Sequence, residues 1–165
     1  MKLIVAVSKT WGIGKDGDLL FHFPEDMKYF RETTKGSIVI MGRTTLDSLP
    51  GGEPLKGRVN IVLTRNRELK KDGVNFVYSI DELLREVGEK EAFVIGGAEV
   101  YTSLLQYCDE AYVTKVDAVV DADKYIPNLD ELPEWKVTCE SDTLIDEKTQ
   151  IKFSFLKYEN NGVKE

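Results

Sequence analysis

Residues 38–45 read IVIMGRTT, an apolar run that ends in glycine and is followed at once by residues suited to open a helix. Residues 92–101, AFVIGGAEVY, repeat this order of apolar run, glycine and helix start. Runs without a polar position are typical of strands that are covered on both faces. The two segments therefore predict parallel strands with helices packed on their sheet.

The rest of the chain continues this alternation. Apolar runs predict strands at 3–7, 37–41, 59–63, 74–77, 92–95 and 111–116, and the intervening segments predict helices at 24–34, 44–49, 80–87 and 98–106. We expect an α/β fold with a largely parallel central sheet flanked by helices. Residues 136–140 and 151–158 predict a C-terminal antiparallel edge hairpin, because their connection is too short for a parallel crossover. We expect one domain over residues 1–160 and a polar tail over 161–165.

Composition narrows the function. The chain has 165 residues, 42% of them hydrophobic, and a net charge of −7, which disfavours nucleic acids and anionic membrane surfaces as partners. The apolar start is too short for a signal peptide or a membrane span. Cys108 and Cys139 lack C-x-x-C spacing and His22 is the only histidine, so neither a zinc site nor a Ser-His-Asp or Cys-His mechanism is expected. We expect a cytoplasmic monomer that acts on small molecules without a metal.

Residues at the predicted strand ends indicate an anion site. Arg43 would oppose the dipole of the helix that it opens, unless an anion lies between its guanidinium and the free N–H groups of the helix start. A helix cap explains the hydroxyls of Thr44 and Thr45 equally well. Gly96 and Gly97 permit close approach of a ligand, although such pairs also occur in tight turns. Because parallel strands end at one edge, a ligand with two or more phosphates would fit there, even without a G-x-G-x-x-G fingerprint.

Other polar residues near the strand at 59–63 extend this pattern. Thr64 and Arg65 follow it and could reach a further phosphate, which is a weak signal because surface arginines are common. Arg58 precedes the strand and could clamp a carboxylate with two N–H groups.

The stretch 12–34, GIGKDGDLLFHFPEDMKYFRETT, places a carboxylate among apolar side chains. Pro24 suits the first position of a helix, so Asp26 falls in the first turn. Phe30 lies one turn further along the same face, and Phe23 and Met27 are also apolar. Taken alone, Asp26 is as well explained by the positive end of the helix dipole as by a functional role.

Together these segments resemble the dihydrofolate reductase family of bacterial type. The matching segments are GIGKDGDLLFHFPEDMKYF, IVIMGRTT, LKGRVNIVLTR, FVIGGAEVY, YVTKVDA and DADKYIP, in the family's order and spacing. Each is a weak signal alone, but six in order are strong. The resemblance implies NADPH-dependent reduction of 7,8-dihydrofolate to 5,6,7,8-tetrahydrofolate, which supplies one-carbon metabolism, with antifolate inhibitors as further ligands.

The resemblance also assigns a substrate side. It implies that Asp26 is the catalytic carboxylate and holds the pterin ring, with Thr114 in the same network, and that Arg58 binds the α-carboxylate of the glutamate tail. Desolvation should raise the pKa of Asp26 while a hydrogen bond from Thr114 opposes the rise, and we expect a net rise. The implied substrate-side residues are Ile4, Val5, Ala6, Leu19, Phe21, Met27, Phe30, Leu49, Leu55, Arg58, Ile95 and Thr114.

A cofactor side for NADPH follows from the same resemblance. Arg43 and Arg65 would lie near the 2′-phosphate, the Gly96–Gly97 bond would be cis, and the loop over residues 9–23 would be a mobile lid over the nicotinamide. The implied residues are Ala6, Ile13, Gly14, Gly17, Asp18, Leu19, Gly42, Arg43, Thr44, Thr45, Leu63, Thr64, Arg65, Ile95, Gly96, Gly97, Ala98, Glu99, Val100 and Tyr101.

Three positions depart from the family pattern, and two rival functions stay open. Phe21 stands where most bacterial relatives have tryptophan and cannot donate an indole N–H, Leu46 also replaces a frequent tryptophan, and Glu99 puts a negative charge on the phosphate side. One rival is a ribosyl-pyrimidine reductase of the riboflavin pathway type, which would favour a phosphate-binding cluster over an apolar cleft. The other is a pterin- or nucleotide-binding module without turnover.

Overall fold

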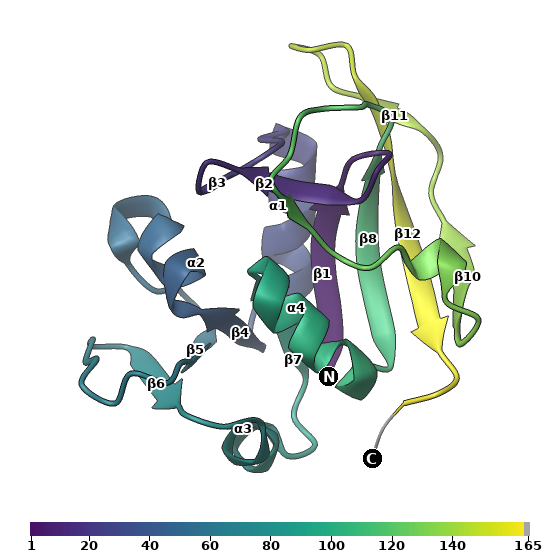
Figure 1. Ribbon diagram of the computed structural model, residues 1–165. Helices are drawn as coiled ribbons and strands as arrows, with labels where there is room; N and C mark the ends of the chain where they lie inside the picture. Colours follow the sequence, from purple (N-terminus) through teal and green to yellow (C-terminus); the bar gives the residue numbers. More distant parts are fainter. Residues whose placement is uncertain (164–165) are drawn as a thin grey trace.

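A sheet of nine strands forms the centre of residues 1–163, the part of the chain that this computed structural model describes (Figure 1). Its order is β10-β12-β8-β1-β7-β4-β5-β6, with β11 paired to β12. The strands are β1 Lys2–Val7, β4 Ile38–Gly42, β5 Val59–Leu63, β6 Val74–Val77, β7 Ala92–Gly96, β8 Glu110–Val116, β10 Trp135–Glu140, β11 Leu144–Ile145 and β12 Lys152–Asn160.

The pairing directions confirm the predicted fold class. β1, β4, β5, β6, β7 and β8 pair in parallel, which requires crossover connections. β12 runs antiparallel to β8, and β10 and β11 run antiparallel to β12, so the C-terminal edge hairpin is present. The sequence pattern missed β11, which has only two residues.

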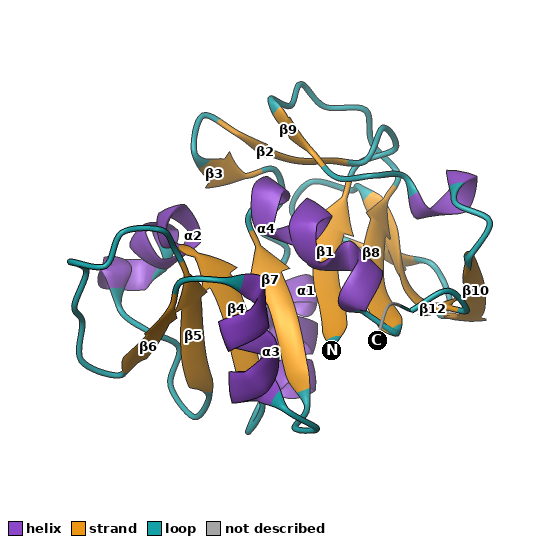
Figure 2. Ribbon diagram, turned by 60° about the horizontal axis from the view of Figure 1, so that its bottom comes forward, coloured by secondary structure: helices purple, strands orange, loops and turns teal. Residues whose placement is uncertain are grey.

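Helices cover both faces of this sheet (Figures 1 and 2). α1 lies behind the sheet and α4 in front of it in the view of Figure 1. In the region 1–163 no helix has the length and apolar character needed to cross a membrane. The predicted helix over 98–106 tightens into a 3₁₀ turn after Leu104. The helices are α1 Pro24–Thr34, α2 Arg43–Ser48, α3 Ile80–Val87 and α4 Ala98–Leu104, with 3₁₀ turns η1 Pro50–Gly52, η2 Leu105–Tyr107 and η3 Leu129–Glu131.

Alternation along the strands divides the buried side chains between the two faces. The main core packs the face with Leu3, Val5 and Val7 against α3 and α4. On the opposite face, a small core of Val39, Met41, Leu46 and Val62 packs α2 against β4 and β5. In β8, Ala111 and Val113 belong to the main core, so Thr114 faces the other side of the sheet.

A second, three-stranded sheet corrects the prediction that residues 9–23 form a loop. β2, Gly12–Lys15, pairs with β3, Asp18–Leu19, and with β9, Lys124–Tyr125 (Figure 2). Asp16 and Gly17 turn the β2–β3 hairpin with positive φ angles of 51° and 81°. An Asp-Gly pair is a strong hairpin signal, and the sequence interpretation overlooked it.

The predicted C-terminal tail begins as ordered chain. The Asn161 N–H donates to the Glu134 carbonyl at 2.9 Å, and the Gly162 N–H donates to Asn160 Oδ1 at 2.8 Å. The last two residues of the predicted tail, 164 and 165, lie outside the described residues.

Asn60 fixes the segment that carries two substrate-side candidates. Its side chain is only 2% exposed. Asn60 Oδ1 accepts from the Leu55 N–H at 2.9 Å, and its Nδ2 donates to the carbonyls of Leu55 and Arg58 at 2.9 and 3.2 Å. One buried amide thus ties Leu55 and Arg58 to the start of β5.

We predict that Asn60→Ala lowers the free energy of unfolding by about 1–3 kcal/mol, because it leaves peptide groups without partners. Urea unfolding measures this loss. Asn75→Ala, at an exposed position of the edge strand β6, is the matched control and should change the free energy by less than about 0.5 kcal/mol. Equal effects of both substitutions would contradict the anchoring role of Asn60.

Candidate active site

The Asp26 carboxylate meets Thr114 at the start of α1. Pro24 begins the helix, and the N-cap residue Phe23 supplies no side-chain hydrogen bond. From β8, 88 residues away in the sequence, the Thr114 hydroxyl donates a hydrogen bond of 2.6 Å to Asp26 Oδ1. A distant strand therefore provides the partner of this carboxylate, which a helix-dipole role alone does not require.

The environment of Asp26 changes its ionisation. Burial raises the pKa of Asp26 above its ordinary range, and the hydrogen bond from Thr114 opposes that rise. The net direction expected from the sequence is confirmed. A charge at this position is costly unless a ligand supplies further donors, so the carboxylate is suited to bind N–H groups.

The predicted apolar residues differ in exposure. Leu49, Leu55 and Ile95 all pack against the small core, so the structure brings these three together. Phe21 is buried and Phe30 is half-buried, whereas Met27 is 49% exposed and Leu19 is 66% exposed. Phe30 is thus turned further into the protein than Met27.

Several predicted contact residues direct their side chains into the main core. Val5, Ile13 and Tyr101 are buried members of it, and Leu63 packs against it. The Tyr101 hydroxyl donates to the Ile4 carbonyl at 2.7 Å and links α4 to β1. A ligand on the opposite face can meet Val5 only through its backbone, whereas Ile4 and Ala6 direct their side chains toward that face.

Arg58 lies between the end of α1 and the start of β5. Its Nε donates to the Lys56 carbonyl at 2.9 Å and its Nη1 to Thr34 Oγ1 at 3.2 Å. Burial lowers the pKa of Arg58, and the nearby Arg31 lowers it further. Within residues 1–163 no carboxylate lies within ion-pair distance of Arg58. An oriented cation beside a second cation is suited to hold an external anion.

The strand ends expected on the cofactor side lie next to one another. β7, β4 and β5 are adjacent parallel strands, so α2, α4 and the segment after Leu63 start at one edge of the sheet. The Gly96–Gly97 bond is cis, as expected. Gly96 has a φ of 138°, and a Cβ there would lie 3.1 Å from Thr45 Oγ1. Only glycine therefore lets the starts of α2 and α4 approach this closely.

The suggested N-cap at Thr44 or Thr45 is wrong. The first helical residue of α2 is Arg43 and its cap is Gly42, while α4 is capped by Gly97; neither cap supplies a side-chain hydrogen bond. Glycine has no side-chain acceptor, so no cap side chain occupies the first N–H groups of either helix. A backbone that leaves these donors open at a shared edge is suited to phosphate oxygens.

The charged residues of this edge are open to solvent. Arg43 is exposed, and its Nε lies 3.6 Å from Asp47 Oδ2 on the next helical turn. Arg65 is exposed as well, while the Thr64 hydroxyl accepts from the Asn66 N–H at 3.1 Å. Glu99 is exposed in the first turn of α4, where its charge opposes binding of an anion.

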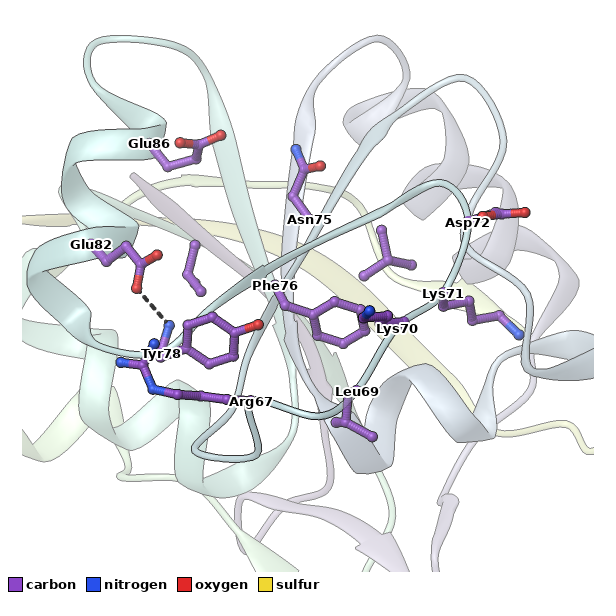
Figure 3. Close-up of a pocket in the computed structure, with 12 residues that line it drawn as sticks. Arg67, Leu69, Lys70, Lys71, Asp72, Asn75, Phe76, Tyr78, Glu82 and Glu86 are labelled. Atoms are coloured by element: carbon purple, nitrogen blue, oxygen red, sulfur yellow. Dashed lines mark hydrogen bonds between the residues drawn. The ribbon is translucent and has the colours of Figure 1, made fainter.

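A separate pocket of about 520 Å³ lies at the β6 edge of the sheet (Figure 3). The Arg67 guanidinium lies 4.5 Å from the centre of the Tyr78 ring, and Glu82 accepts from the Tyr78 N–H at 2.9 Å. The wall of this pocket also includes Phe76 and Asn75, and none of the predicted site residues lines it. The sequence interpretation did not single out this region.

The raised pKa of Asp26 leads to a stability prediction. At a pH above the ordinary range of aspartate, the folded state must hold a charge that the unfolded state holds more easily, so the charge costs stability. We predict that Asp26→Asn raises the melting temperature at neutral pH, and that this gain disappears as pH falls below the ordinary pKa of aspartate. Thermal unfolding across this pH range measures the effect.

Glu25→Gln is the control, since Glu25 is an exposed carboxylate in the same helical turn. Losing its favourable interaction with the helix dipole should cost about 0.3–1 kcal/mol. If Asp26→Asn destabilised the protein at neutral pH as Glu25→Gln does, Asp26 would be only a helix-dipole residue.

Comparison with known proteins agrees with this geometry. A family model described as dihydrofolate reductase matches residues 1–160. The dihydrofolate reductase of Bacillus subtilis is 39% identical over 163 residues, covering 98% of this chain and 95% of the relative, and that of Mycobacterium leprae is 40% identical over 147 residues, covering 83% and 89%. The solved dihydrofolate reductase of Enterococcus faecalis, complexed with NADP(H) and RAB-propyl, superimposes with a TM-score of 0.87 at 31% identity, covering 97% of this chain and 95% of that one. Matched over nearly its whole length in both sequence and architecture, this chain belongs to the dihydrofolate reductase family.

Proposed function

We propose that this protein reduces 7,8-dihydrofolate to 5,6,7,8-tetrahydrofolate with NADPH and thereby supplies one-carbon metabolism. The observation that carries the proposal is the Asp26 carboxylate, partly buried on α1 and held by Thr114 from β8. Membership of the dihydrofolate reductase family supports the same reaction.

Asp26 is suited to hold a pterin ring. Thr114 occupies Oδ1 at 2.6 Å, which leaves Oδ2 and the second lone pair of Oδ1 as acceptors. A pterin presents an amino group and a ring N–H side by side, and a carboxylate accepts such a pair through two charge-assisted hydrogen bonds. These donors would replace the water that burial has removed from Asp26.

The same negative charge assists the chemistry. A fixed carboxylate beside the ring favours the protonated pterin, and reduction of C6 requires a proton at N5. Asp26 does not need to contact N5, because the interaction of charges in a partly buried site acts over several ångströms. Phe30 and the side chains on the small core would exclude water from the remainder of the ring.

The edge where α2 and α4 begin fits a cofactor with several phosphates. The glycine caps Gly42 and Gly97 leave the N–H groups of both helix starts free of side-chain partners, and Arg43 adds a positive charge. Arg65 and Thr64 at the end of β5 extend this surface and would favour the additional phosphate of NADPH over NADH. Bound NADPH supplies the hydride, and the protein contributes position and electrostatics.

Arg58 would hold the glutamate tail of the substrate. Thr34 and the Lys56 carbonyl already orient its guanidinium, so less conformational freedom is lost on binding. The absence of an acidic partner within residues 1–163 supports an external carboxylate as its ligand.

We further propose that the protein acts as a cytoplasmic monomer, with dihydrofolate, NADPH and antifolate inhibitors as its ligands. Both cysteines are free, Cys108 buried and Cys139 exposed, as suits a reducing compartment. The net charge of −7 argues against binding to nucleic acid or an anionic membrane surface.

The direct test is loss of NADPH absorbance when dihydrofolate is added. We expect turnover with dihydrofolate and none with a ribosyl-pyrimidine phosphate, the substrate of the rival reductase. Turnover of the ribosyl-pyrimidine alone would favour that rival, and tight binding of dihydrofolate without NADPH oxidation would favour a module without turnover.

We predict that Asp26→Asn reduces turnover at neutral pH by at least roughly a hundredfold, the scale of acid–base assistance. Lower pH should restore part of the rate, because acid then protonates N5 in solution. The wild-type rate should fall as pH rises. Steady-state and single-turnover kinetics from mild acid to mild alkali measure both profiles, with folding checked by circular dichroism. A folded variant with near-normal turnover at neutral pH would refute the mechanism.

We predict that Arg58→Leu weakens binding of dihydrofolate by about 2–5 kcal/mol, the scale for a charge pair that loses one partner. Binding of a pterin without the glutamate tail should change little. Calorimetry with both ligands separates these effects. Arg67→Leu, at the β6 edge, is the control arginine and should alter neither. Equal losses for both ligands would show that Arg58 acts through the fold.

A further inference from the structure

Five aromatic rings from three segments form a continuous series, which we call the aromatic ladder: Phe21, Phe23, Phe153, Phe155 and Tyr29. Phe23 and Phe153 stack with ring centres 5.1 Å apart and planes 27° apart. Phe155 and Tyr29 stack more closely, at 4.1 Å and 19°. Phe153 meets Phe155 edge to face at 5.7 Å, and Phe21 meets Phe23 at 5.4 Å. Such contacts are specific in direction as well as attractive.

The ladder brackets Asp26 on α1. Phe23 precedes Asp26 by three residues and Tyr29 follows it by three, so the two rings flank the carboxylate at the start of the helix. Phe153 and Phe155 are two residues apart on β12 and share one face of the sheet. Each ring of β12 therefore stacks on one of the rings that flank Asp26.

The sheet places Thr114 at a fixed position relative to this ladder. Phe155 and Thr114 are direct partners in the antiparallel pairing of β12 with β8. Directly opposed side chains on neighbouring strands lie about 4.5–5.5 Å apart at their Cβ atoms. Thr114 bonds to Asp26 while its partner Phe155 stacks on Tyr29, one helical turn further along. The start of α1 is thus held at three points whose spacing the sheet determines.

The aromatic contacts and the hydrogen bond from Thr114 act on the start of α1. Its N-cap makes no side-chain hydrogen bond, and the hydrogen bond from Arg58 to Thr34 acts on the far end of the helix. We propose that Phe153 and Phe155 are positioning residues that act through Phe23 and Tyr29 to hold the Asp26 carboxylate against Thr114 and away from water.

The catalytic consequence of this inference rests on the proposed function, but the positioning itself does not. The titratable groups whose pKa values respond to the charge of Asp26 are the hydroxyls of Tyr29 on α1 and of Tyr101, which lies in the main core on the other face of the sheet. Burial raises the pKa of both hydroxyls, so they stay neutral. In the described part of the chain, burial and the Thr114 hydroxyl are the two influences on the ionisation of Asp26. A loosened ladder should admit water and return the pKa of Asp26 toward its ordinary value.

The test measures the carboxyl of Asp26 directly, by carbon NMR titration of protein labelled at aspartate and with Asp26→Asn identifying the signal. Tyr29→Leu and Phe155→Leu each remove one ring of the tightest stack and should lower the pKa of Asp26. Tyr29→Phe keeps the ring and should leave the pKa of Asp26 at the wild-type value. Tyr78→Leu, at a half-buried aromatic residue just after β6 at the opposite edge of the sheet, is the control for general loosening of the fold.

The same variants are assayed for reduction of dihydrofolate. Small displacements of a catalytic group lower the rate strongly, so kcat should fall roughly tenfold to a hundredfold in the two leucine variants and little in Tyr29→Phe or Tyr78→Leu. The pH at which the rate declines should also move downward, because a carboxylate that is exposed to water favours the proton at N5 less strongly. KM should change less than kcat if position, rather than binding, is lost.

Two results would overturn the proposal. One is a pKa of Asp26 that stays at the wild-type value in folded Tyr29→Leu and in folded Phe155→Leu, which both replace half-buried residues. The other is an equal shift in Tyr29→Phe, which would assign the effect to the hydroxyl. If the wild-type protein failed to reduce dihydrofolate, the proposed function would fail while the NMR titration still decided the role of the ladder.

Discussion

The parallel alignment of β1, β7, β4 and β5 is the constraint on which the rest of the molecule depends. Parallel strands end at one edge, so the connections that follow β4, β7 and β5 all leave from the same side of the sheet. The glycines at 42, 96 and 97 stand at the exits of β4 and β7. A Cβ atom added to Gly96 would lie only 3.1 Å from Thr45 Oγ1, which shows how closely α2 and α4 meet there. Without this alignment, the residues of the cofactor side would lie on separate parts of the surface.

A second constraint is the alternation of side chains between the two faces of the same sheet. Alternation in β8 directs Ala111 and Val113 to the main core and leaves Thr114 facing α1. The partner of Asp26 is therefore set by strand register rather than by the helix that carries Asp26. Two influences on the pKa of this carboxylate oppose each other: burial disfavours the charged form, and the hydrogen bond from the Thr114 hydroxyl stabilises it. A group balanced in this way responds strongly to donors that a ligand brings.

The sequence interpretation failed where short polar segments pair over long distances. β2 and β3 have four and two residues and lack an apolar run, yet they form a sheet with β9, more than 100 residues later. Pairing of so few residues depends on tertiary contacts, although the Asp16-Gly17 turn could have revealed the hairpin. The N-cap prediction for α2 failed for a different reason. The helix begins one residue earlier than predicted, at Arg43, so Gly42 is its cap and both threonines lie inside the helix.

Sequence alone determined the features that depend on local periodicity and residue type. The apolar runs of β1, β4, β5 and β7 identified a covered parallel sheet, Pro24 located the start of α1, and six ordered segments pointed to the family. Their physical basis is local, because burial on both faces and helix geometry constrain neighbouring residues directly. The tertiary structure decided which distant side chains meet. It paired Asp26 with Thr114 across 88 residues, directed Val5 and Tyr101 into the main core, and stacked Phe153 and Phe155 on the rings beside Asp26. These outcomes depend on strand register and on which face of the sheet each residue occupies, and both are set by pairing between segments far apart in the chain.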